Sequence, residues 1–252
     1  AYHVYYEHMP LRRRAAPVGP DMLLYRALDW GSLAQIQMVD DRQYRDGKSC
    51  QPAGPSKRGK LIGDCEERRD PTRSILGKPQ EAWLLDALAS SKAQWNLLAQ
   101  QTLMAELQLG DPAQQTTRFY SSDGWDGYPA NRARIVERWR EAKVSNPIAL
   151  GGDIHAFAAA NLTETLDGPP VAATFVGGSI SSLGGESDVF AAKNPHIKQF
   201  DGKVRGYGRL DLTPKDSRMT FRTVENALVA TSPIRDLASF ALENGRPGVH
   251  RA

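Results

Sequence analysis

The sequence predicts an α/β domain built in layers, with a candidate functional site at one end of its strands. Short apolar runs typical of strands alternate with helix-like segments over much of the chain. Strands joined by short turns follow towards the C-terminus. Three of the strand-like runs lead directly into acidic residues. Open α/β sheets place their ligand sites beyond the carboxyl ends of strands, so these residues are the first functional candidates.

The individual elements follow from their local patterns. Residues 77–88 predict an amphipathic helix with Pro79 near its first turn, and residues 130–142 predict a second helix with an apolar face. Residues 95–100 have mixed propensities, which favour a strand but leave a helix open. Strands are predicted at 23–30, 34–39, 148–150, 171–176, 206–212, 219–224 and 239–243, with a turn at 244–248.

The central candidate is the segment 147–155, an apolar strand that ends in Gly151 and Gly152 before Asp153 and His155. Two glycines allow a sharp turn and a close approach of the backbone. A carboxylate and an imidazole at this spacing can bind one metal ion or flank two. The pattern predicts that Asp153 is buried near such a site. The alternative is an Asp that caps the next helix with a His packed beneath it.

A second strand end carries Asp40, Asp41 and Arg42, where the planar guanidinium of Arg42 suits a phosphate group. In the loop 120–129, Asp126 or Asp123 is expected either to bind a metal or to cap the following helix. The loop 177–185 has backbone amides that suit an anion. A turn at 194–196 presents His196, which the sequence suggests is exposed.

Composition narrows the class of protein. The 252 residues contain 40% hydrophobic and 24% charged residues, as expected for a globular domain. The formal net charge of +3 is too balanced to indicate specific nucleic-acid binding. No apolar run is long enough to span a bilayer. Cys50 and Cys65 share a long polar loop, where they are either a disulfide or two free thiols, and their spacing is no zinc motif.

Six motifs in this order resemble the PhoD-like metallophosphatases, the alkaline phosphatase D family. The matching segments are 6–12 (YEHMPLR), 39–46 (VDDRQYRD), 76–84 (LGKPQEAWL), 126–129 (DGYP), 152–155 (GDIH) and 194–198 (NPHIK). The resemblance implies a calcineurin-like metallophosphoesterase fold, in which two sheets form a sandwich flanked by helices. It also implies a secreted or periplasmic enzyme that hydrolyses phosphodiesters and phosphomonoesters with iron and calcium, or other divalent metals.

Carried over by position, the resemblance places Asp153 and His155 in the metal centre, with Asp40 and Arg42 at a neighbouring strand end. The family usually has a small residue where this chain has Asp41, so Asp40 is the preferred ligand. Asp126 is a further metal candidate. Tyr128 and His196 match segments that suggest contact with the substrate. Arg42 would stabilise the transition-state charge, and His155 would either bind metal or protonate the leaving group.

The resemblance leaves out the first half of the family pattern, which includes an N-terminal β-sandwich domain, a metal-binding cysteine motif and a Trp-Asp-Asp-His-Glu-like motif. Residues 1–252 are therefore expected to form the C-terminal part of a single metallophosphatase domain, with the N-terminal portion supplied elsewhere or as a separate chain. The alternative is a non-catalytic binding or partner subunit of the same fold. Metal content distinguishes the two, because a complete site of this type holds about two metal ions.

Overall fold

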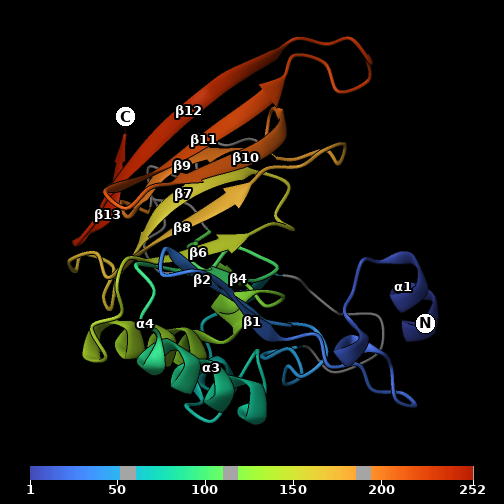
Figure 1. Ribbon diagram of the computed structural model, residues 1–252. Helices are drawn as coiled ribbons and strands as arrows, with labels where there is room; N and C mark the ends of the chain where they lie inside the picture. The colour runs from blue at the N-terminus through green and yellow to red at the C-terminus, as the bar shows by residue number, and fades with distance from the viewer. Residues whose placement is uncertain (52–60, 110–118, 186–193, 252) are drawn as a thin grey trace.

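A seven-stranded sheet runs through the middle of the computed structural model, which describes residues 1–51, 61–109, 119–185 and 194–251 (Figure 1). Its strand order is β1-β2-β4-β6-β8-β7-β9. Strands β2, β4, β6 and β8 are parallel, whereas β1 and β7 run antiparallel to their neighbours. The strands are β1 (Arg26–Trp30), β2 (Ala34–Met38), β4 (Trp95–Ala99), β6 (Pro147–Gly151), β7 (Phe157–Leu162), β8 (Ala172–Gly177) and β9 (Ile197–Asp201).

Strand β4 resolves the ambiguous segment 95–100 as a strand. Leu97 belongs to the buried cluster on one face of the sheet and Leu98 to the cluster on the other face. A strand that is buried on both faces loses the apolar–polar alternation by which strands are recognised in a sequence. The same two-sided burial explains the continuous apolar run of β6, in which Ile148 and Ala149 point to opposite faces.

A second, antiparallel sheet covers one face of the first. It consists of β10 (Arg205–Leu212), β11 (Asp216–Val224), β12 (Ile234–Glu243) and β13 (Arg246–Arg251), in that order. Phe221 and Phe240 from this sheet join Phe157 and Phe175 from the central sheet in one buried cluster. The ring centroid of Phe221 lies 5.0 Å from that of Phe157 and 5.5 Å from that of Phe240.

The C-terminal strands are longer than the sequence predicts. Strand β12 begins at Ile234 rather than at residue 239. The prediction missed its first residues because they are exposed, partly charged and carry no apolar pattern. The predicted turn at 244–248 is only partly right, since β13 begins at Arg246 and contains Pro247. Strand β13 lies at the edge of its sheet beside a register shift, where a proline without an N–H is tolerated.

Helices α3 (Lys78–Ser90) and α4 (Pro129–Glu141) cover the opposite face of the central sheet (Figure 1). Leu84 and Leu88 of α3 pack in the same cluster as Ile135 and Trp139 of α4. Both helices agree with the sequence prediction to within a few residues. No helix in the described part of the chain has the length and apolar character needed to cross a membrane.

Smaller elements surround the layers, and the sequence alone did not predict most of them. They are α1 (Tyr2–His8), η1 (Arg13–Ala15), β3 (Leu61–Gly63), α2 (Glu66–Arg69), β5 (Phe119–Ser121) and η2 (Trp125–Gly127), with β3 and β5 paired antiparallel. Cys50 and Cys65 form a disulfide with a Cα–Cα distance of 6.4 Å, which decides between the two alternatives for these cysteines. The bridge fastens the polar loop to the start of α2.

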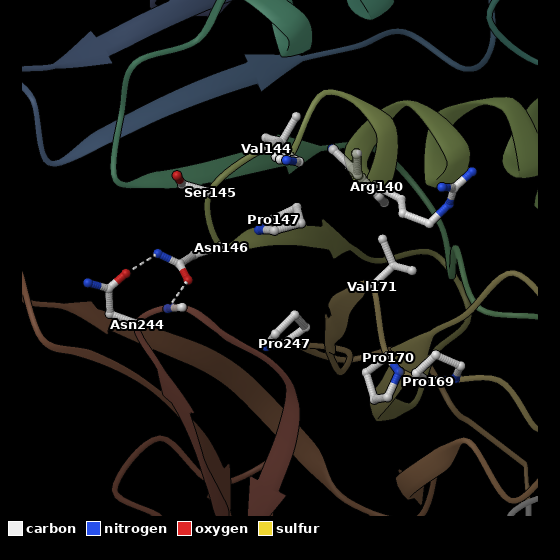
Figure 2. Close-up of a pocket in the computed structure, with 13 residues that line it drawn as sticks. Arg140, Val144, Ser145, Asn146, Pro147, Pro169, Pro170, Val171, Asn244 and Pro247 are labelled. Atoms are coloured by element: carbon white, nitrogen blue, oxygen red, sulfur yellow. Dashed lines mark hydrogen bonds between the residues drawn. The ribbon is translucent and has the colours of Figure 1, made fainter.

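Asn146, just before β6, links the amino ends of β4 and β6 to the second sheet (Figure 2). Its side-chain amide donates to the carbonyl of Gln94 at 2.8 Å and to the side chain of Asn244 at 2.7 Å. Its side-chain oxygen accepts from the Gly245 amide at 2.8 Å. This clamp ties the β12–β13 turn to the central sheet, beside a pocket of about 420 Å³ that includes Pro147, Pro170 and Pro247.

The packing of the two sheets predicts a large effect of Phe221→Ala. Phe221 is fully buried, and its removal would leave a cavity between the sheets, which typically costs about 3–5 kcal/mol. Urea unfolding should therefore show a loss of this size, whereas Leu228→Ala, at a position that is 94% exposed, should change stability by less than about 0.5 kcal/mol. Equal effects of the two substitutions would contradict the assigned packing.

Candidate functional site

The carboxyl ends of three parallel strands meet at one edge of the central sheet. The loop after β2 carries Asp40, Asp41 and Arg42, the loop after β4 carries Gln101, and the loop after β6 carries Asp153 and His155. Because β2, β4 and β6 are adjacent and parallel, these loops emerge side by side. This is the edge at which open α/β sheets place ligands.

Gln101 connects the three loops. Its side-chain amide donates to the Val39 carbonyl at 2.7 Å, and its side-chain oxygen accepts from the Asp41 amide at 2.8 Å. The backbone carbonyl of Gln101 accepts from the Gly152 amide at 3.2 Å. Gln101 thus sets the spacing between the loop that carries Arg42 and the loop that carries Asp153, a role that sequence reasoning missed because a lone Gln gives no signal.

Asp40, the acidic residue that the sequence analysis preferred as a ligand, organises its own turn. One carboxylate oxygen accepts from the amides of Arg42 and Gln43, both at 2.9 Å, and the other accepts from the Gln43 side chain. The backbone of Asp40 is held by Gln80 of α3 at 2.7 and 2.8 Å. Both carboxylate oxygens are therefore occupied by protein donors, as in an Asx turn.

Asp41 has the carboxylate with fewer hydrogen bonds, since Oδ2 accepts from the Gln101 amide at 3.3 Å. Its side chain is fully buried, and its Oδ1 atom has no hydrogen-bond partner among the described residues. The nearest cation is Nη1 of Arg42, 3.5 Å from Oδ1. Burial raises the pKa of Asp41 to about 6, and the positive charge of Arg42 opposes that rise only in part. Oδ1 thus has one cation at ion-pair distance but no hydrogen bond, so it can still accept from a donor or bind a further cation.

Arg42 bridges three loops through one guanidinium group. Nη2 donates to Oδ2 of Asp153 at 2.9 Å, and Nη1 donates to the backbone carbonyl of Asp123 at 3.0 Å. With Asp41 also nearby, the guanidinium neutralises carboxylates from the loops after β2 and β6. The Arg42 side chain is 35% exposed, so a ligand can reach it from solvent.

Asp153 and His155 occupy unusual backbone conformations at the end of β6. Their φ angles are +66° and +57°, values that Asp and His tolerate better than most residues but that still cost energy. Such conformations gather at functional sites. The expectation that Asp153 is buried is wrong, because its side chain is 52% exposed. Both residues are exposed at the edge of the sheet.

The hydrogen bond of His155 decides which ring nitrogen is available. Nδ1 lies 3.0 Å from the carbonyl oxygen of Leu183, in the loop after β8. A carbonyl only accepts, so Nδ1 carries the proton and Nε2 has the lone pair in the neutral ring. No hydrogen bond to Nε2 is made within the described residues. Nε2 is therefore free to bind a metal ion or to hold a proton.

Asp123 forms ion pairs with two further basic side chains near this edge. Its carboxylate pairs with Arg45 and with Lys48, each at 2.9 Å. Partial burial raises the pKa of Asp123, but hydrogen bonds from Lys48 and Arg45 outweigh burial and lower it below its ordinary value. Asp123 does not cap α4, as one alternative from the sequence suggested, because that helix has no side-chain cap.

Asp126 lies in a separate, buried ion-pair network. One of its oxygens accepts from Nη1 of Arg132 at 2.6 Å, and the other accepts from the Leu107 amide at 2.9 Å. Nη2 of Arg132 also donates to Glu106 at 3.0 Å. Both oxygens of Asp126 are thus engaged, and it is neither grouped with Asp153 and His155 nor a cap of α4. Burial raises the pKa of Asp126, while Arg132 and the Leu107 amide oppose the rise.

Tyr128 and His196 are also buried rather than exposed. The hydroxyl of Tyr128 donates to the Asp46 carbonyl, and its ring belongs to the apolar cluster beneath α4. His196, expected on an exposed turn, is only 6% exposed, and its Nε2 donates to the Glu106 carbonyl at 2.7 Å. Burial lowers the pKa of His196 and favours the neutral ring. Tyr128 therefore contacts the loop after β2 at Asp46, whereas His196 contacts the chain at Glu106.

The residues at this edge are of types that bind metal ions, but they are too few to complete a metal site. Asp41, Asp153 and His155 offer two carboxylates and an imidazole nitrogen, which suit hard or borderline divalent cations. The buried Oδ1 of Asp41 makes no hydrogen bond to the described residues and has only the Arg42 guanidinium nearby, at 3.5 Å, and this is the observation that favours a cation here. Within the described ranges, however, no three or more His, Cys, Asp or Glu side chains are arranged to hold a metal.

The mixed α/β fold, with charged residues at the carboxyl edge of its parallel strands, defines a protein of the α/β class with a candidate site for an anion or a metal. Comparison with known proteins makes this more specific. The sequence model of the family described as PhoD-like phosphatase matches residues 1–221. The chain therefore belongs to the PhoD-like phosphatase family, as the motif resemblance suggested.

Two relatives illustrate the membership. The chain is 38% identical over 262 aligned residues to alkaline phosphatase D of Bacillus subtilis (strain 168), and this match covers 100% of the chain and 43% of that protein. A solved structure described as the structure of PhoD shares 37% identity with a TM-score of 0.88, covering 100% of this chain and 48% of that one. The chain thus spans less than half the length of either relative.

The buried carboxylate of Asp41 predicts a pH-dependent effect of Asp41→Asn. Its pKa of about 6 in the folded protein exceeds the ordinary value of 3.8, so ionisation destabilises the fold as the pH rises through this window. At pH 8, in a chelating buffer, Asp41→Asn should stabilise the protein by up to about 3 kcal/mol. The gain should vanish below about pH 4, where the carboxyl group is protonated in both states. Thermal unfolding at several pH values measures it, and a gain that persists at low pH would contradict the cause.

The network around Asp126 predicts a structural role for this residue. Asp126→Ala leaves the buried guanidinium of Arg132 with one carboxylate fewer and should cost about 3 kcal/mol. The exposed Asp86→Ala, on α3, is the matched control and should change stability by no more than about 0.5 kcal/mol. Chemical denaturation compares the two. Unchanged stability in Asp126→Ala would reopen its assignment as a ligand.

Proposed function

We propose that this chain is part of a metal-dependent phosphoesterase that hydrolyses phosphodiesters and phosphomonoesters. Family membership supports a phosphatase. The observation that carries the proposal is the gathering of a guanidinium, two carboxylates and an imidazole at one strand edge. The two packed sheets with helices on the outer face suit the C-terminal part of a calcineurin-like metallophosphoesterase sandwich.

Arg42 is the phosphate-binding residue in this proposal. Its guanidinium can donate a charge-assisted hydrogen bond to a phosphoryl oxygen. Nη1 donates to the Asp123 carbonyl and stays in place. Nη2 donates to Asp153, and it would donate to the phosphoryl group instead when substrate binds. The fixed positive charge then opposes the negative charge that develops on the phosphoryl oxygens in the transition state.

His155 can fill only one of the two roles suggested for it. Because Nδ1 is committed to Leu183, a metal bond and a transferable proton would both need Nε2. We assign His155 to the metal together with Asp153 and Asp41. Metal bound by these residues would polarise the phosphoryl group and lower the pKa of a bound water. The identity of the metals as iron and calcium is part of the proposal and follows from the family resemblance.

We further propose that residues outside this chain complete the centre. The chain spans less than half of each relative, and its described residues lack a group of three metal donors. Residues 1–252 would then be the C-terminal part of one domain, and its partner would be the remainder of the same enzyme. The Cys50–Cys65 disulfide supports a secreted or periplasmic location, since such bonds persist in oxidising compartments.

The proposal predicts that the 252-residue chain alone hydrolyses p-nitrophenyl phosphate and bis(p-nitrophenyl) phosphate at background rates. A protein that also contains the remainder of the enzyme should turn over both esters in a metal-dependent manner. In that protein Asp153→Asn should lower turnover by at least about 100-fold and reduce bound metal, because a ligand is lost. Turnover assays and elemental analysis measure both effects.

Asp211→Asn is the matched control for this experiment. Asp211 is 51% exposed and pairs with Arg209 at 3.0 Å, much as Asp153 is 52% exposed and pairs with Arg42. It lies on β10, away from the strand edge, so its substitution should leave turnover unchanged. Full activity in Asp153→Asn would refute the site. A complete protein without metal and turnover would favour the non-catalytic partner subunit.

A further inference from the structure

A pocket of about 370 Å³ opens directly beside Arg42. Asp40, Arg42 and Gln101 form the side of the pocket that belongs to the candidate site. Tyr2 and Tyr5 of α1 form another part of its wall. The pocket is therefore continuous with the proposed phosphate position, unlike the larger pocket around Pro147, which lies at the opposite end of β6 (Figure 2).

Tyr5 of α1 offers exposed aromatic surface beside this pocket, and Tyr2 is partly buried in its wall. Tyr5 is 43% exposed, and α1 has no buried residue at all. A helix of seven residues is too short to be stable through its own hydrogen bonds, so its few contacts along this pocket matter for its position. Aromatic rings left accessible next to a charged site are suited to pack against a flat or apolar ligand.

The pocket also contains a second guanidinium. Arg26 begins β1 and pairs in register with Met38, two residues before Asp40, which places it near the same strand end as Arg42. Its Nη1 donates to the Leu24 carbonyl at 2.8 Å. Within the described ranges no carboxylate lies within ion-pair distance of Arg26. Two guanidinium groups and two tyrosines together suit an anion that has an aromatic or apolar body.

We propose that this pocket binds the alcohol portion of the substrate and selects phosphate esters whose alcohol is aromatic. The ring packs against Tyr5 and Tyr2, while Arg42 meets the phosphoryl group. Arg26 adds positive potential that favours the anionic ester over a neutral aromatic compound. This inference rests on the proposed function, because it takes Arg42 as the phosphate-binding residue.

The test compares two probes, phenyl phosphate and inorganic phosphate, by calorimetric or NMR titration of the 252-residue chain. Phenyl phosphate should bind more tightly than phosphate. Tyr5→Ala should weaken phenyl phosphate by about three- to tenfold, as expected for the loss of one aromatic contact, and leave phosphate unchanged. Tyr5→Phe, which keeps the ring, should retain the affinity for phenyl phosphate.

Tyr6→Ala separates loss of the ring from loss of the helix. Tyr6 lies on α1 but does not line the pocket, so its substitution should leave both affinities unchanged. Equal weakening by Tyr5→Ala and Tyr6→Ala would overturn the inference, because disruption of α1 would then explain both. Equal affinity of the two probes for the unaltered chain, or no effect of Tyr5→Ala on phenyl phosphate, would overturn it as well.

Arg42→Gln tests the underlying function separately. It should weaken both probes, because both carry the phosphoryl group. If Arg42→Gln changes neither affinity while Tyr5→Ala still weakens phenyl phosphate, the assignment of Arg42 fails and the aromatic pocket stands. If Arg42→Gln weakens both probes and Tyr5→Ala weakens neither, the phosphate site stands and the pocket inference fails.

Discussion

Burial of the central strands on both faces is the constraint on which the candidate site depends. Leu97 and Leu98 of β4 enter opposite cores, one beneath the phenylalanine cluster of the second sheet and the other above α3 and α4. A slip of one residue would exchange the two side chains between cores of different shape, so the register is strongly specified. The loops after β2, β4 and β6 therefore start from fixed points, and Gln101 needs only a few hydrogen bonds to hold them together.

The sequence predicted a helix or strand well where the pattern that identifies it lies within the element itself. The apolar run before Gly151, the helix that begins near Pro79 and the helix of Ile135 and Trp139 all depend on neighbouring residues. The start of β12 escaped prediction because its exposed, charged residues resemble a loop and become a strand only through pairing with β11. Strands β3 and β5 are three residues each, too short to show any alternation.

The site was harder to predict, because the sequence shows which acidic residues are present but not which partners they find. Asp40 and Asp41 are neighbours, and only the turn formed with Gln43 and Gln80 shows that both oxygens of Asp40 accept hydrogen bonds whereas Oδ1 of Asp41 accepts none from the described residues. From the sequence, Asp126 was expected to be a metal ligand or a helix cap. In the structure its two oxygens accept hydrogen bonds from Arg132 and the Leu107 amide. His196 follows a turn signal in the sequence, yet its ring is buried and hydrogen-bonded to the carbonyl of Glu106, ninety residues away.

These contacts divide the charged residues into two groups with different physical demands. Asp40 and Asp126 satisfy their oxygens within the protein, so they stabilise loops and have little left to offer a ligand. Asp153 and His155 do the reverse, since they remain exposed in strained conformations that cost roughly 1–3 kcal/mol each. Arg42 uses Nη1 to donate to the backbone carbonyl of Asp123 and Nη2 to donate to Asp153. A backbone carbonyl cannot leave its position, whereas an exposed carboxylate can change partners. The geometry therefore fixes where Arg42 sits and leaves open what it binds, which is the property that a substrate-binding arginine requires.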